Sequence, residues 1–115
     1  MGNALVNRAI ALRPNYAHVS VSAFVVLLAM SRTALDRDQA HDDGPTVPAR
    51  HYYAGWRLLA LMLGHKDPGD EKPLPPAAKQ AVARAVRELT DCGLIGRAAP
   101  EIDAAFRHRV YVIRI

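Results

Sequence analysis

Apolar residues recur at helical spacing in the C-terminal third of the chain, over residues 78–89. A step of about 100° per residue brings one set of side chains to the same side of a helix: Ala78, Val82, Ala85, Val86 and Leu89. By the same step a second set lies about 150° away: Lys79, Gln80, Ala83, Arg84 and Arg87. The pattern predicts a helix that buries one face and exposes three cations and an amide on the other.

The residues on either side of this helix predict its two ends and a hairpin after it. Pro75 and Pro76 suit a first helical turn, which needs no N–H donor, and Gly93 suits the left-handed residue after a helix. Two strand-like segments come next, 94–98 and 109–115, separated by the polar segment 99–108. We therefore expect a C-terminal β-hairpin behind the helix.

A first helix is predicted from Ser20 or Ser22, either of which can cap it, to about Leu35. Its inward side chains should be Phe24, Leu27, Leu28 and Met30. The apolar run also permits a buried strand over 19–26, but its length favours the helix. The segment 36–50 contains Gly44, Pro45, Pro48 and four aspartates, a composition typical of a loop.

A second helix is predicted over 49–63, because Tyr53, Trp56, Ala60 and Leu63 fall at helical spacing. Tyr52 is expected to be exposed beside this core. The segment 65–73 connects the helix to the next one. Residues 1–17 are predicted to form an N-terminal arm or a frayed helix, broken at Arg13-Pro14 because the residue before proline avoids the helical region. Residues 18–115 then form one domain that is mainly α with a C-terminal β-hairpin.

Composition and charge narrow the functional classes. The chain has 115 residues, half of them apolar, with a net charge of +4, which fits one globular domain. Basic residues lie toward both ends of the chain and acidic residues in the middle, a distribution that orients a protein in front of a polyanion. There is no signal-peptide pattern, and the apolar run 19–30 is too short to cross a bilayer. We expect a cytoplasmic protein without membrane contact.

The residue types needed for catalysis are scattered. The five histidines have no metal-binding spacing, and the single cysteine, Cys92, excludes a disulfide framework and is expected to be a small buried filler. The aspartates around His41 could hold a divalent cation, but solvation of a loop is the better account, because no rigid element positions them. The sequence predicts no enzyme, no metal site and no cofactor.

Residues 52–64, 82–89 and the triplet Gly93-Leu94-Ile95 together resemble small winged helix-turn-helix DNA-binding proteins of bacteria and bacteriophages. The similarity extends over about 19–115 and implies three helices plus a wing. It implies that one group of residues faces the major groove: Lys79, Gln80, Ala83, Arg84 and Arg87. A second group would contact the backbone or the minor groove: Arg97, Arg107 and Arg109. The long, proline-containing connection at 65–73 departs from the pattern of the family.

The resemblance and the basic helix lead to a hypothesis of sequence-specific binding to double-stranded DNA, by a transcriptional regulator of phage or mobile-element type. A single module reads few base pairs, so a homodimer is expected, with the first helix or the N-terminal arm as the contact. One alternative is a DNA-binding accessory factor in replication initiation or site-specific recombination. Another is a winged-helix protein-interaction module that does not bind DNA.

Overall fold

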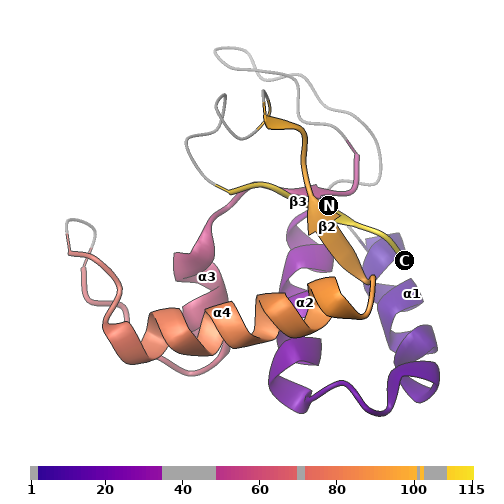
Figure 1. Ribbon diagram of the computed structural model, residues 1–115, viewed down its shortest axis with the longest axis horizontal. Helices are drawn as coiled ribbons and strands as arrows, with labels where there is room; N and C mark the ends of the chain where they lie inside the picture. The colour runs from indigo at the N-terminus through magenta and orange to yellow at the C-terminus, as the bar shows by residue number, and fades with distance from the viewer. Residues whose placement is uncertain (1–2, 35–48, 70–71, 101, 103–108) are drawn as a thin grey trace.

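The computed structural model describes residues 3–34, 49–69, 72–100, 102 and 109–115. Over these residues the fold is mainly helical, with a small antiparallel sheet (Figure 1). The helices are α1 (Asn3–Leu12), the short 3-10 helix η1 (Arg13–Tyr16), α2 (Val21–Thr33), α3 (Trp56–Met62) and α4 (Pro76–Asp91). The strands are β1 (His51–Tyr52), β2 (Ile95–Arg97) and β3 (Tyr111–Ile113).

Helix α2 begins at one of the two serines predicted to cap it. The Ser20 hydroxyl accepts a hydrogen bond from the backbone N–H of Ala23 at 3.1 Å, which satisfies one of the unpaired donors of the first turn. The helix ends at Thr33, close to the predicted end at Leu35. The alternative strand over 19–26 is therefore wrong.

The second predicted helix is wrong in its first half. In place of a helix over 49–63, the chain forms β1, turns at Gly55 with a left-handed φ of 82°, and only then enters α3. Aromatic side chains favour strands, and glycine adopts this φ without a Cβ clash. Local spacing favours the helix, but pairing with β3 overrides it: Tyr52 lies opposite Tyr111.

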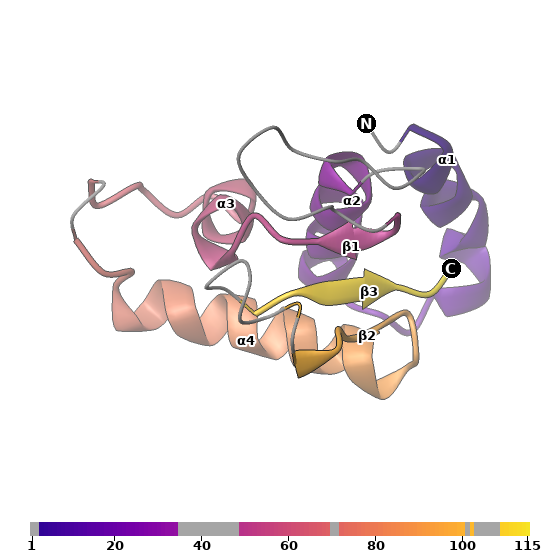
Figure 2. The ribbon, with the colours of Figure 1, turned by 90° about the horizontal axis from the view of Figure 1, so that it is seen from above.

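The sheet consequently has three strands and not the predicted two. Its order is β1-β3-β2, so β3 pairs with both neighbours (Figure 2). The predicted antiparallel pairing of the two C-terminal segments is confirmed, with Ile95 opposite Ile113. Helix α2 lies against β1 and helix α4 against β2. The sheet thereby joins residues 51–52 to the C-terminal end of the chain.

Helix α4 and its ends match the sequence pattern. Pro76 is its first residue, Pro75 precedes it, and Gly93 follows it with a φ of 80°. Cys92 caps the helix and is half-buried, with its thiol donating to the Leu89 carbonyl at 3.5 Å, so the expected buried filler is only partly enclosed.

The N-terminal segment forms α1, which packs on α2 and buries Leu5 and Ala9 in the common core. At the break predicted for Arg13-Pro14, α1 passes into η1. The Arg13 guanidinium donates to the carbonyls of Tyr16 and Val19 at 2.9 and 2.8 Å. This bridge holds the chain between α1 and α2.

Tyr52 is fully buried, contrary to the expected exposure, while Tyr53 is half-buried. The Tyr52 hydroxyl donates to the Gly55 carbonyl at 2.6 Å. It therefore closes the turn between β1 and α3 from inside the core. The error has the same cause as the misplaced helix, since a strand at 51–52 turns this side chain inward.

The buried Tyr52 hydroxyl sets an alkaline limit on stability. Burial, and secondarily the neighbouring Tyr111, raises the pKa of Tyr52 above its ordinary value of 10.0. In the unfolded chain the Tyr52 side chain ionises from about pH 10, while in the folded protein it stays protonated. Its contribution to the free energy of unfolding is therefore complete below pH 10 and falls above it. One such group lowers the free energy of unfolding by about 1.4 kcal/mol per pH unit.

We expect Tyr52→Phe, although less stable at neutral pH, to lose stability less steeply than the parent above pH 10. Urea unfolding at successive pH values measures the two slopes. Tyr16→Phe, which removes a hydroxyl from a half-buried ring, is the control and should follow the parent. If the free energies of unfolding of Tyr52→Phe and the parent fell in parallel above pH 10, groups other than Tyr52 would cause the loss of stability at high pH.

Candidate nucleic-acid interface

Helix α4 separates its side chains into two faces. Five residues are buried in the core: Ala78, Val82, Ala85, Val86 and Leu89. The opposite set, which we call the basic face of α4, consists of Lys79, Gln80, Ala83, Arg84 and Arg87. Its four long side chains are exposed, and Ala83 among them is half-buried. The structure thus brings five of the predicted site residues together on one solvent-facing surface.

Helix α4 is fixed at its C-terminal end by a carboxylate that faces α2. Glu88 accepts hydrogen bonds from the backbone N–H of Ser20 at 2.5 Å and from the Ser20 hydroxyl at 2.9 Å. A negative charge at a helix N-terminus also interacts favourably with the helix dipole. No local pattern in the sequence predicts this contact, because the partners lie 68 residues apart.

The connection between α3 and α4 is organised by Arg57. Its guanidinium donates to Asp67 Oδ1 at 2.8 Å, to the Gly69 carbonyl at 2.8 Å and to the Lys72 carbonyl at 2.5 Å. The backbone N–H of Gly69 and, next, the Arg57 side chain hold the pKa of Asp67 below its ordinary value. The long connection that departs from the family pattern is therefore bonded back to α3. The sequence pattern predicts Arg57 only as one residue of the helix over 49–63, with no role in the connection.

The predicted cations of the sheet side lie against aromatic rings. Arg97, in β2, has its guanidinium 5.7 Å from the centre of the Tyr111 ring, and the Arg109 guanidinium is 5.8 Å from the Trp56 ring. Trp56 Nε1 in turn donates to the Tyr111 hydroxyl at 3.1 Å. Both arginines remain exposed. Arg107 lies outside the described residues.

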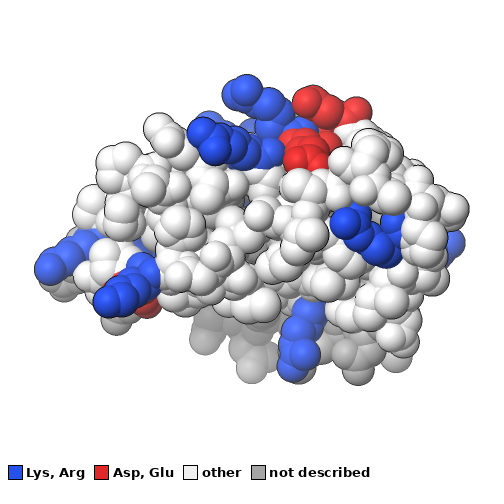
Figure 3. All heavy atoms as spheres, turned by 90° about the horizontal axis from the view of Figure 1, so that it is seen from below, with Lys and Arg blue, Asp and Glu red and all other residues white. Residues whose placement is uncertain are grey.

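Charge is distributed unevenly over the surface. Seen from below in Figure 3, Lys and Arg side chains lie in separate groups with uncharged surface between them, and Asp or Glu side chains adjoin the groups at the top and at the left. Helix α4 itself contains Glu88 and Asp91 near its end, after its three cations. A polyanion would therefore meet positive charge along only part of the helix.

Features of metal-binding and membrane proteins are lacking over the described ranges. There, His, Cys, Asp and Glu side chains form no group that could hold a metal ion. The aspartates around His41 lie outside these ranges. An open groove of about 470 Å³ between α2 and α4 is lined by side chains that include His18, Glu88 and Asp91. None of the described helices has the length and apolar character needed to span a bilayer.

Comparison with protein-family models, curated proteins and solved structures found no match to this chain. The function of this chain is therefore inferred from the geometry of the described residues.

Proposed function

We propose that this chain is a winged helix-turn-helix protein that binds double-stranded DNA in a sequence-specific way, as a transcriptional regulator of phage or mobile-element type. The observation that supports this most is the exposed basic face of α4, on a helix packed against α2 and α3 and followed directly by the antiparallel pair β2–β3. Three helices followed by such a pair are the arrangement that a winged helix-turn-helix requires.

The side chains of the basic face have the chemistry for reading bases. An α-helix fits the major groove, where arginine pairs with guanine through two hydrogen bonds and glutamine pairs with adenine in the same way. Arg84 and Gln80 would supply these contacts. The half-buried Ala83 between them lets the backbone approach the base edges.

Arg97, Arg107 and Arg109 are proposed to contact phosphates or the minor groove. Phosphate contacts fix the register of a protein on the duplex without reading its sequence. The aromatic rings beside Arg97 and Arg109 support this role, because stacking limits the conformations of both guanidiniums before binding.

A homodimer is part of the proposal, since one module buries too little DNA surface for useful specificity. The proposed contact lies on α1 and on the first turn of α2, at the opposite end of that helix from Arg32. The exposed apolar side chains Ile10 of α1 and Val21 of α2, at 55% and 72% exposure, support this choice.

Replacing Arg84 with alanine is expected to weaken specific binding by about 1–3 kcal/mol and to relax the preference at one base pair. Arg97→Ala should weaken binding to all duplexes alike, because a phosphate contact conveys no sequence. Fluorescence anisotropy with a selected duplex and its single-base-pair variants measures both effects, with Arg32→Ala as the control on α2. Equal, sequence-blind losses for Arg84→Ala and Arg97→Ala would contradict these roles.

The proposal as a whole is tested by selecting random duplexes with the purified protein at two salt concentrations. Enrichment of one motif at both concentrations, with weaker retention at the higher one, is the expected result. A second candidate, a protein-interaction module without DNA binding, is favoured by Leu61 and Met62, which α3 exposes at 41% and 52%. Failure to retain any duplex at low salt would favour that module, because even non-specific DNA binding is electrostatic.

A further inference from the structure

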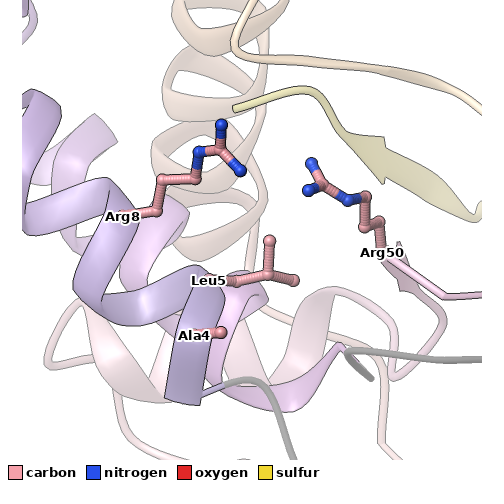
Figure 4. Close-up of a pocket in the computed structure, with 4 residues that line it drawn as sticks. All are labelled: Ala4, Leu5, Arg8 and Arg50. Atoms are coloured by element: carbon pink, nitrogen blue, oxygen red, sulfur yellow. The ribbon is translucent and has the colours of Figure 1, made fainter.

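Two arginines from distant parts of the chain share one small pocket. Arg8, on α1, and Arg50, immediately before β1, line a pocket of about 100 Å³ together with Ala4 and Leu5. Figure 4 shows the two side chains reaching from opposite sides toward the same space, with Leu5 between them. The pocket does not include the basic face of α4, so it lies outside the proposed DNA contact.

The two guanidiniums repel each other, and no Asp or Glu side chain is among the described residues that line the pocket. The ion pair found among the described residues is Arg57–Asp67, which involves neither arginine of the pocket. Two like charges that face one small pocket lower the stability of the folded protein unless an anion lies between them.

Arg50 is held in this position by the end of the chain and by its own backbone. Its Nη1 donates to the Ile115 carbonyl oxygen at 2.7 Å, and its carbonyl accepts from the Ile113 N–H at 2.8 Å. Its φ of 64° lies in the left-handed region, which non-glycine residues seldom adopt. Strain of this kind is concentrated at ligand-binding sites, where surrounding contacts maintain it.

We propose that the Arg8–Arg50 pocket binds a small oxyanion, a phosphate or carboxylate group. Guanidinium groups match both anions through paired N–H donors. The volume of about 100 Å³ is large enough for an oxyanion group. Bound there, the anion would join α1 to the region where β1 meets the end of β3.

Thermal unfolding in sodium phosphate, against sodium chloride of equal ionic strength, tests the proposal. Binding to the folded state alone predicts a rise in Tm that grows with the logarithm of phosphate concentration above Kd and reaches about 5 °C at a concentration tenfold above Kd. Arg8→Gln, which alters an exposed side chain, should abolish this logarithmic part. Arg32→Gln removes the same charge from α2 and should retain it. The linear stabilisation that phosphate gives to most proteins should be equal in all three.

Sodium acetate in a parallel series distinguishes the source of the anion. A logarithmic rise in Tm with phosphate alone indicates a phosphoryl ligand, with acetate alone a carboxylate, and with both a general oxyanion site, provided that Arg8→Gln removes the effect. Arg50→Gln is a second variant, whose folding is checked by circular dichroism because Arg50 also bonds to Ile115.

The proposal is overturned if neither salt gives a logarithmic rise in Tm, or if Arg8→Gln retains that rise. It is also overturned if Arg8→Gln weakens duplex binding while free phosphate gives no logarithmic rise, since Arg8 would then be a DNA contact. Loss of duplex binding is not required by the proposal, so the pocket and the proposed DNA-binding function stand or fall separately.

Discussion

Replacing Tyr52 with alanine is expected to lower the free energy of unfolding by about 3–5 kcal/mol, the range for truncating a buried aromatic residue. The side chain is completely buried, so its removal leaves a cavity in the core beside β1. It also removes the hydroxyl that donates to Gly55, which leaves a buried carbonyl without that donor. Small domains have only about 5–15 kcal/mol of stability, so the variant is expected to melt about 15 °C lower.

Tyr53→Ala is the matched control, because it makes the same substitution at the next residue, which is only half-buried. It should cost about 1 kcal/mol. Urea unfolding of both variants at pH 7 compares the two losses directly. If the loss for Tyr52→Ala were as small as that for Tyr53→Ala, β1 would not be part of the cooperative core, and the third strand would add little to the stability of the fold.

The parts of the fold that sequence patterns predicted are those determined by neighbouring residues. Ser20 caps α2 through a bond to Ala23, three residues away, and Gly93 follows α4 in a conformation that glycine favours locally. The two faces of α4 follow from periodicity within the helix. Short-range rules suffice in each of these cases.

The parts that could not be predicted depend on residues far apart in the chain. Strand β1 has two residues and forms because Tyr52 meets Tyr111. A segment this short has too few alternating positions to show the period of a strand. The aromatic and apolar spacing over 53–63 extends the helical pattern of α3 to residues before its first turn. Tertiary pairing decided the outcome.

The candidate sites divide in the same way. The basic face of α4 could be found from sequence, since its members lie within nine residues of one another. The Glu88 contact with Ser20 and the convergence of Arg8 on Arg50 join segments that only folding brings together. No spacing rule relates such residues, so these contacts can be identified only in the folded structure.

Reversing both Arg84 and Arg87 to glutamate is expected to weaken binding to any duplex by at least about 100-fold at low salt. Two lost contacts of about 1–3 kcal/mol each account for this factor, and the new carboxylates add repulsion against the phosphates. The plot of log affinity against log salt should become less steep, since binding by a less cationic surface releases fewer counterions from the DNA. Anisotropy titrations at four salt concentrations measure both quantities.

The matched control reverses Arg32 and Lys66, two exposed cations that lie outside α4 and the sheet. Each pair of reversals changes the net charge by four, from +4 to 0, so the variants differ only in where charge is lost. We expect the control to retain most of its affinity for the duplex. Its plot of log affinity against log salt should be as steep as that of the parent. Equal losses would mean that binding depends on total charge and not on the basic face of α4. No loss in either variant would remove α4 from the interface and favour a partner other than DNA.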